Sequence, residues 1–362
     1  MFEESHRKIA TETLESIGIN DPALHDAARV GARLGELGLY RHLHPASVRT
    51  LCAVREILAY ASPLADAVFA VQGLGLMPLV GAGRMDLAQK MLAGERIGAF
   101  ALTEPEAGSD VAAMRATATR DGKSWVIEGD KTFISNVGIA HHYVVFANAA
   151  PERGKKGISA FLVDAHAPGL ELVRIELSFE HPLGRLVLRG CKVPDSALLG
   201  DVGDGLSVAL GTLETFRTSV GAAALGMAHR AIDATLEHVT RRVQFGKPLA
   251  DFQLTQAAIS DMVTELEAAR LLVSATERIK DLAKESVAAD VAMAKLHATE
   301  IAQRIIDRAV QLHGGLGVVL GSVVEELYRE VRPLRIYEGA TEVLKLLVGG
   351  AVVKAHGREA PP

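Results

Sequence analysis

Three long segments in the second half of the chain constrain its fold most strongly. They cover residues 206–242, 254–282 and 287–312, contain no proline and are amphipathic at helical spacing. Positions 221–226 are almost all Gly or Ala, which predicts a closely packed helix face. Helices of this length usually belong to a bundle and often to an oligomer interface. The sequence therefore predicts a C-terminal helical bundle.

The first 200 residues divide into a helical part and an extended part. Ser47 suits the N-cap of a helix over 48–60, and Ser62-Pro63 opens the next helix. From about residue 99 short apolar runs alternate with Gly, Pro and Asp, and Asp121-Gly122 is a hairpin signal. The other elements we predict are helices over 21–37, 86–92, 323–332 and 342–355 and strands over 125–128, 143–146, 158–163, 170–173 and 185–188.

The predicted fold class follows from this order of elements and is α+β. It comprises an N-terminal α-helical domain over residues 1–98, a middle β-domain over 99–200 and a C-terminal helical bundle over 201–362. Because the strands follow one another without intervening helices, the middle domain is not a βαβ alternation.

Composition and motif content exclude several classes of protein. The net charge of −5 provides no basic face for nucleic acid, and neither a GxGxxG after a strand nor a GxxxxGK[ST] occurs. Cys52 and Cys191 match neither a disulfide framework nor a zinc pattern. His141 and His142 would point to opposite faces of a strand. We therefore predict no nucleic-acid partner and no bound metal.

Two stretches bear on where the protein works. Residues 67–83 are apolar but fall short of the ~20 residues that span a bilayer. They also contain Gln72 and Pro78, so we expect a buried helix that leads into a loop. Residues 1–6 are acidic at once and lack the basic start and apolar core of a signal peptide. We expect a cytoplasmic protein that does not bind a membrane.

Four stretches carry residue types that suit ligand binding. Residues 100–110 mix hydroxyls, a proline and a glycine, and residues 130–136 place an aromatic, hydroxyls and an amide side by side ahead of a strand. Residues 241–249 end a long helix with arginines, and residues 311–317 place paired glycines after another. Backbone N–H groups and arginines suit a phosphate. Each stretch alone also fits a capped turn, a basic helix end or a glycine C-cap.

A fifth stretch, residues 335–342, joins two helix-like segments near the end of the chain. It places Glu338 between Tyr337 and Gly339. A glycine lets the backbone approach a ligand closely. A carboxylate in such a joint either faces solvent or points into a cavity, and this stretch alone leaves both readings open.

Together and in this order, the five stretches resemble the acyl-CoA dehydrogenase family over essentially the whole chain. Residues 100–110 match an aromatic followed by x-x-T-E-P-x-A-G-S-D, and residues 129–136 match G-x-K-x-x-I-[TS]-N. Residues 242–249 match R-x-x-F-G-x-x-L, residues 311–317 match Q-x-x-G-G-x-G, and residues 336–342 match I-Y-E-G-x-x-E.

The resemblance implies a helical domain, a β-domain and a four-helix bundle, assembled as a homotetramer (or dimer) with one FAD per subunit. Part of each FAD would reach a neighbouring subunit. The implied electron acceptor is an electron-transfer flavoprotein. Matching motif positions predicts that the FAD is bound by Phe100, Leu102, Thr103, Gly108, Ser109, Phe133, Ser135, Arg242, Phe245, Gln253, Gln311, Gly314, Gly315 and Glu342. The Ser135 hydroxyl would lie near the flavin N5.

The resemblance also implies a reaction. Glu338 falls on the family's catalytic base, which removes the α-proton of an acyl-CoA thioester while the β-hydrogen leaves as hydride to flavin N5. The product is a trans-2-enoyl-CoA, and the implied setting is fatty acid metabolism. A carboxylate desolvated at this site should have a raised pKa. The substrate-binding positions predicted in the same way are Ser109, Glu214, Arg217 and Gly339.

The sequence departs from the family pattern at several positions. Ala340 stands where the family usually has Thr, and Phe133 where many members have Trp. Residues 181–184 replace a strand rich in serine and threonine, in a segment near the CoA end that is shorter than usual. Three alternatives stay open: an acyl-CoA oxidase, a flavin monooxygenase of the same fold, and a non-catalytic flavoprotein.

Overall fold

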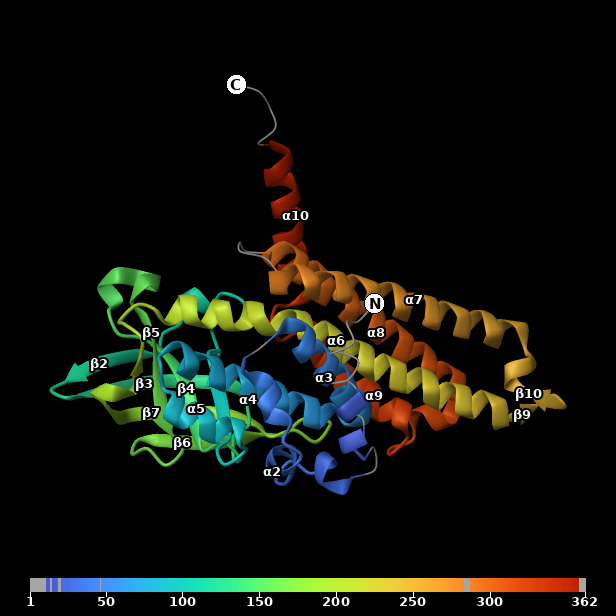
Figure 1. The fold of residues 1–362 in the computed structure, drawn as a ribbon, viewed down its shortest axis with the longest axis horizontal. Coiled ribbons are helices and arrows are strands. Elements are labelled where there is room, and N and C mark those ends of the chain that lie inside the picture. The colour runs from blue at the N-terminus through green and yellow to red at the C-terminus, as the bar shows by residue number, and fades with distance from the viewer. Residues whose placement is uncertain (1–10, 14, 19–20, 46, 283–286, 358–362) are drawn as a thin grey trace. The chain divides into compact units, whose positions relative to one another are not determined.

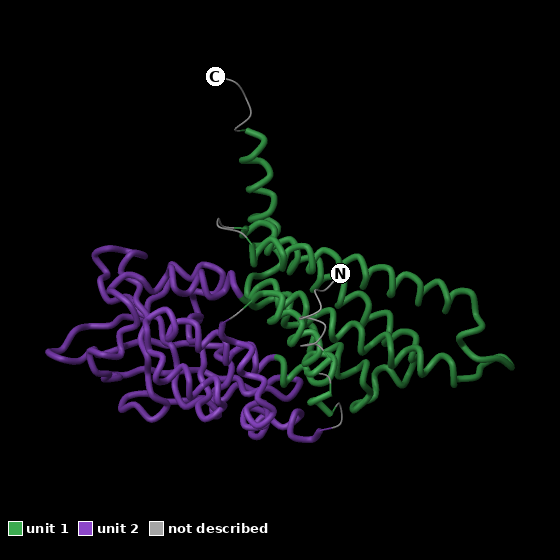
Figure 2. The backbone as a smooth tube through the Cα atoms, in the orientation of Figure 1, with its two compact units in different colours: residues 1–20, 46–66, 216–362 green, residues 21–45, 67–215 purple. Residues whose placement is uncertain are grey.

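The computed structural model describes residues 11–13, 15–18, 21–45, 47–282 and 287–357. Residues 1–6, on which the signal-peptide prediction rests, lie outside this part. The chain forms two compact units, coloured separately in Figure 2. Unit 1 comprises Met1–Asn20, Ala46–Asp66 and Phe216–Pro362, and unit 2 comprises Asp21–Pro45 and Ala67–Thr215. The boundaries of the three predicted domains stay a prediction.

The predicted α+β fold class is confirmed, because N-terminal helices, a middle β-sheet and C-terminal helices follow one another along the chain (Figure 1). The helices after the sheet are α6 (Gly205–Arg241), α7 (Gln253–Leu282), α8 (Ala288–His313), α9 (Val323–Val331) and α10 (Thr341–Gly357). The three long helices therefore lie within one or two residues of their predicted bounds. A 3-10 turn at Arg332–Arg335 separates α9 from the 336–340 joint.

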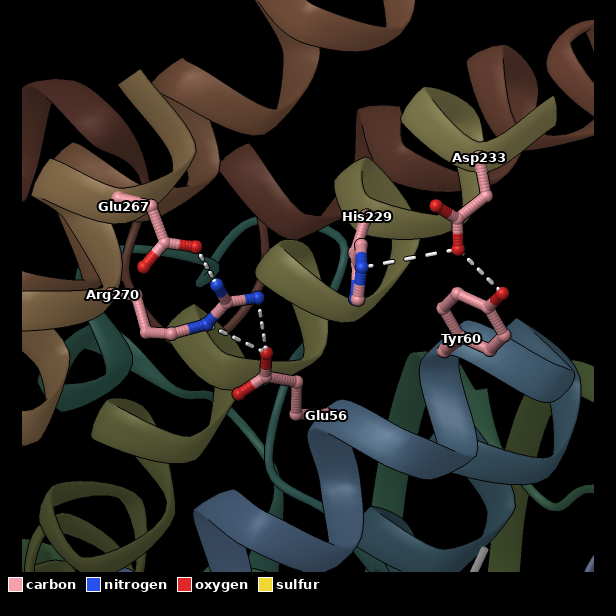
Figure 3. A network of polar contacts seen from close by, with 6 residues as sticks. All are labelled: Glu56, Tyr60, His229, Asp233, Glu267 and Arg270. Carbon is pink, nitrogen blue, oxygen red and sulfur yellow. Dashed lines mark hydrogen bonds and ion pairs between the residues drawn. The ribbon is translucent and has the colours of Figure 1, made fainter. Parts of the chain in front are cut away.

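Helix α3 (Val48–Ala61) packs with α6 and α7 inside unit 1. Ser47 caps it as predicted, since its hydroxyl accepts a hydrogen bond from the Thr50 N–H. Figure 3 shows the polar contacts that tie it to the bundle. The Arg270 Nη2 of α7 lies 2.9 Å from the Glu56 Oε1, and the Tyr60 hydroxyl donates to the Asp233 carboxylate of α6 at 2.7 Å.

The middle of the chain forms an eight-stranded sheet in unit 2. Its strands are β1 (Gly98–Ala101), β2 (Thr117–Asp121), β3 (Ser124–Ser135), β4 (His142–Asn148), β5 (Ile158–Asp164), β6 (Leu170–Ile175), β7 (Leu183–Pro194) and β8 (Leu198–Leu199). The order is β6-β7-β3-β2-β4-β5-β8, with β1 parallel to β4. The predicted hairpin is present, because Asp121 pairs with Ser124 across a turn at Gly122. Trp125 is buried in the core of the sheet.

Several predicted element boundaries are wrong, and the strand predicted over 185–188, for example, is the longer β7. The 21–37 segment is not one helix: a 3-10 turn at Pro22–His25 precedes α2 (Val30–Glu36). The Asp26 carboxylate accepts from the Ala28 N–H, and such a local bond competes with helix formation. Residues up to Ser135 lie within β3 rather than ahead of a strand. A register shift after Lys131 interrupts the pairing there, which hid the strand from the sequence pattern.

The apolar stretch forms helix α4 (Pro63–Gly81), and α5 (Met85–Leu92) follows it. Among the described residues α4 is the one helix long and apolar enough to cross a membrane, and 72% of its apolar window is buried inside the fold. Gln72 at its centre donates to the carbonyls of Met91 and Arg96 and accepts from the Gly98 N–H. These bonds account for the polar side chain within a core helix.

Helix α6 approaches the backbone of α3 so closely at Gly226 that an added Cβ would overlap the Glu56 carbonyl oxygen. We therefore expect Gly226→Ala to lower the free energy of unfolding by about 1–3 kcal/mol, the usual cost of overpacking. Gly211→Ala on the same helix is the matched control, because its Cβ would meet open space. That change should stabilise by about 0.5–1 kcal/mol. Denaturant unfolding measures both, and equal effects would contradict the packing at Gly226.

Candidate active site

Glu338 lies in the joint between the Arg332–Arg335 turn and α10, within unit 1. Its φ of 50° is in the left-handed region, which costs a residue with a side chain. The residue is partly exposed, but its Oε2 atom is buried and has no hydrogen-bond partner among the described residues. A buried carboxylate oxygen without a donor costs free energy. This cost marks Glu338 as a candidate functional group.

Two cationic side chains hold the backbone carbonyls of Glu338 and of the residue that follows it. The Arg217 Nε of α6 donates to the Glu338 carbonyl oxygen at 2.8 Å. The Lys295 Nζ of α8 donates to the Gly339 carbonyl oxygen at 2.7 Å. Gly339 has a φ of 108°, and a Cβ there would lie 2.8 Å from the Leu344 Cδ2, so the position requires glycine.

The charges around Glu338 oppose the effect of its burial. Burial raises the pKa of the Glu338 carboxyl, and the cations Arg55, Arg217 and Lys295 lower it. Asp66 raises it further, and the net result is a raised pKa. Burial removes the solvation of the charged form, whereas nearby cations favour that form. The carboxyl is therefore a stronger base than a solvated glutamate.

A buried ion pair lies beside this group. The Arg55 Nε and Nη2 of α3 bind the Asp66 Oδ1 and Oδ2 at 2.8 Å and 2.9 Å, and its Nη1 donates to the Ser219 hydroxyl at 2.9 Å. The side chains of Arg55 and Asp66 are 0% and 1% exposed. A bidentate pair in this geometry holds the guanidinium rigidly. Asp66 thus fixes the position of one of the three cations near Glu338.

Within unit 2 the first two predicted stretches meet. The Thr132 N–H donates to the Thr103 carbonyl oxygen at 2.9 Å, and the Lys131 Nζ donates to the Leu102 carbonyl oxygen at 3.2 Å. Lys131 also pairs with Glu104 at 2.7 Å in the interior. The loop that follows leaves Gly108 and Ser109 exposed, and Phe100 lies in β1. Thr103 is therefore held close to the end of β3.

Ser135 at the end of β3 has a partner that the sequence did not predict. Its Oγ lies 2.8 Å from the His181 Nε2. Burial lowers the pKa of His181 to about 4, so the imidazole is neutral at physiological pH. His181 belongs to the 181–184 stretch that departs from the family pattern, and its side chain contacts Ser135, a predicted site position.

The predicted cofactor residues of unit 1 lie around two hollows and at other exposed positions. Arg242 lines a hollow of about 500 Å³ together with His238, His313 and Leu316, next to the exposed Gly314 and Gly315. Gln311 lines another of about 510 Å³, whose arginines are Arg304, Arg308, Arg332 and Arg335. Arginine-lined hollows suit a pyrophosphate. Phe245, Gln253 and Glu342 are exposed and line neither hollow.

Backbone strain coincides with the predicted stretches. The non-glycine residues of the described chain with positive φ are Phe133, Asn136, Phe245 and Glu338, and each lies in one of the five stretches. Phe133 and Phe245 are also 64% and 94% exposed. Strained residues and exposed aromatic rings cluster where a protein binds ligands. Taken one by one, the exposed rings suit an aromatic group of a cofactor, and the arginine-lined hollows suit a pyrophosphate.

Sequence reasoning missed three charged residues that surround Glu338, namely Lys295, Arg55 and Asp66. A signal for them was present. Lys295 lies at helical spacing from Val291 and Ala298 on the buried face of α8. Arg55 interrupts the buried face of α3 in the same way. Charged residues are almost never fully buried unless paired, so a charge in an apolar stripe marks a specific role.

The chain matches one protein family in two regions. Residues 99–191 match "Acyl-CoA dehydrogenase, middle domain", and residues 203–353 match "Acyl-CoA dehydrogenase, C-terminal domain". The mitochondrial short-chain specific acyl-CoA dehydrogenase of Bos taurus is 35% identical over 373 residues, which cover 98% of this chain and 90% of that protein. The caffeyl-CoA reductase-Etf complex subunit CarC of Acetobacterium woodii is 36% identical over 288 residues, or 76% and 75% of the two chains.

Solved structures give the same result. A glutaryl-CoA dehydrogenase from Mycobacterium smegmatis, crystallised in complex with FADH2, superimposes with a TM-score of 0.90 at 26% identity. The superposition covers 98% of this chain and 95% of that one.

The raised pKa of Glu338 has a consequence for stability. Its ionisation costs more in the fold than in the unfolded chain, so stability is lost as the pH rises from the usual carboxyl pKa through the raised one. Each unit of such a rise is worth about 1.4 kcal/mol. We expect Glu338→Gln to raise the Tm relative to wild type at neutral pH, and less so in acid. Exposed Glu152→Gln is the control. A Tm difference that does not change with pH would contradict the raised pKa.

Proposed function

Since this chain belongs to the acyl-CoA dehydrogenase family, and is therefore an FAD-dependent oxidoreductase, we propose that Glu338 removes the α-proton of its acyl-CoA substrate. The product is a trans-2-enoyl-CoA. The observation that carries the proposal is the buried Glu338 Oε2, which has no donor among the described residues. A carboxylate oxygen in this state is free to accept a proton from a substrate.

The surroundings of Glu338 support the role of base. An α-proton of a thioester is a weak acid, and a base works best when its pKa lies near the operating pH. Burial raises the pKa of Glu338 in that direction, while three cations keep its charged form accessible. The carboxylate accepts the proton, becomes a neutral acid and loses the cost of a buried charge. Arg217 and Lys295 hold the adjacent backbone in place during this step.

The negative charge that develops on the thioester oxygen needs hydrogen-bond donors. We propose that the Glu338 backbone N–H is one of them. Ser109, Glu214, Arg217 and Gly339 are the proposed substrate contacts. The positive φ values of Glu338 and Gly339 set the direction of this backbone, and Arg217 fixes it through the Glu338 carbonyl.

The proposed FAD contacts are those that the five stretches predict. Arg242 and Gln311 would hold anionic and polar parts of the cofactor from the two hollows. Leu102, Thr103, Ser109, Phe133 and Ser135 are further proposed contacts. Bound FAD supplies the acceptor for the hydride that leaves the substrate β-carbon. Ala340 has no hydroxyl, so the contact to the cofactor that a threonine would make at this position is lost.

The substrate that we propose is a short-chain acyl-CoA, in keeping with the short-chain specific relative. An electron-transfer flavoprotein is the proposed acceptor, because the CarC relative is a subunit of an Etf complex. We also propose that the protein is a cytoplasmic homotetramer that acts in fatty acid metabolism. Retention of Glu338 argues against a monooxygenase, which needs no α-proton base, and the acidic net charge argues against a nucleic-acid-bound flavoprotein.

Anaerobic bleaching of the bound flavin by a panel of acyl-CoA thioesters tests this function. We expect short-chain substrates to bleach it, and subsequent electron transfer to the flavoprotein acceptor to be faster than transfer to oxygen. Glu338→Gln should keep FAD bound but slow bleaching by about 10²–10⁴-fold or more, since the base is gone. Glu152→Gln serves as the control. Bleaching by no thioester would overturn the dehydrogenase proposal, and an unaffected Glu338→Gln would remove Glu338 from the role of base.

A further inference from the structure

Lys295 is buried, and the described part of the chain places no counter-ion at hydrogen-bond distance from its Nζ. Its side chain is 0% exposed on the inner face of α8, between Val291 and Ala298. Among the described residues its Nζ makes one hydrogen bond, to the neutral Gly339 carbonyl oxygen at 2.7 Å. Burial of an unpaired ammonium is expensive. A neutral donor would satisfy that carbonyl at a lower cost, so the bond alone does not account for a lysine.

Four charged side chains act on Lys295. Glu338 acts on it from the joint before α10, Arg335 from the Arg332–Arg335 turn, Arg217 from α6 and Glu300 from its own helix. Arg335 is already paired, because its Nε lies 2.7 Å from the Glu300 Oε1. Thr341 also donates to this Glu300 oxygen at 2.7 Å. Glu300 thus already accepts hydrogen bonds from two other side chains, whereas the buried Glu338 Oε2 has no donor within the described ranges of the chain.

We propose that Lys295 is a positioning residue for the base, which holds the Glu338–Gly339 backbone and keeps the Glu338 carboxylate ionised through its charge. The proposal rests on the role of Glu338 given above. Lys295 keeps its own proton throughout, and the substrate proton goes to the Glu338 carboxylate. Burial lowers the pKa of Lys295 to about 8, so the ammonium form is present at neutral pH. Without the charge of Lys295, fewer cations would oppose the rise in the pKa of Glu338 that burial causes.

The sign of the effect is fixed by electrostatics. A cation near a carboxylate lowers the pKa of that carboxylate, so removal of the Lys295 charge raises the pKa of Glu338. A larger fraction of Glu338 is then protonated at neutral pH and cannot accept the substrate proton. The rate therefore decreases at pH values below the raised pKa of Glu338 and is unchanged at pH values above it. A purely structural role for Lys295 would instead lower the rate by the same factor at every pH.

The test compares two substitutions of Lys295 that separate charge from hydrogen bonding. Lys295→Gln keeps an N–H donor for the Gly339 carbonyl but is neutral, and Lys295→Arg keeps the charge.

The measurement is kcat/KM for flavin reduction from about pH 5 to about pH 9. For Lys295→Gln we expect the acidic limb to move up by about one pH unit or more, which is a tenfold loss at pH values below the limb. Lys295→Arg should restore the limb. Exposed Lys90→Met is the control and should leave the profile unchanged.

A second readout does not depend on turnover. The protonated Glu338 carboxyl has an infrared carbonyl band, which is assigned by its loss in Glu338→Gln. Its titration midpoint should move up in Lys295→Gln and return in Lys295→Arg. An unmoved midpoint in Lys295→Gln, or equal losses of rate in both variants at every pH, would overturn the proposal. Bleaching that survives in Glu338→Gln would instead overturn the proposed function, whatever Lys295 does.

Discussion

The desolvation of one carboxylate, Glu338, is the constraint on which the rest of the site depends. Burial raises the pKa of this carboxyl, and three cations oppose that rise without cancelling it. The result is a carboxylate that is a stronger base than a solvated glutamate. Its left-handed backbone would relax without support, and the Arg217 and Lys295 bonds to successive carbonyls provide that support. Electrostatics and backbone strain therefore meet in the same two residues, Glu338 and Gly339.

The helices of unit 1 bring charged residues that are far apart in the sequence to the same place. Long helices bring Arg55 from α3, Arg217 from α6 and Lys295 from α8 to one short joint. Each of these residues occupies a position that an apolar side chain would fill at lower cost. Proteins often give up stability at functional sites in this way. For Arg55 the loss is limited, because its buried charge is paired in a bidentate contact with Asp66.

The parts that sequence could predict are those set by local chemistry. The N-cap at Ser47, the Asp121-Gly122 turn and the proline-free helices follow from neighbouring residues, and so does the conspicuous position of Glu338. The parts that it missed depend on packing between distant segments. Lys295 lies 43 positions before Glu338, and no local pattern connects them. The His181 contact with Ser135 likewise joins residues 46 positions apart. Even so, a charge within an apolar helix stripe was a usable signal.

The most direct test of the account isolates proton abstraction from hydride transfer. An acyl-CoA analogue with sulfur in place of the β-carbon keeps its α-protons but has no β-hydride to give. Exchange of those α-protons in deuterated water, followed by NMR with the anaerobic FAD-loaded protein, reports the base alone. The account predicts rapid exchange with wild type, at a rate that rises with pH through the Glu338 pKa, and none above background with Glu338→Gln. Equal exchange by both proteins would contradict it.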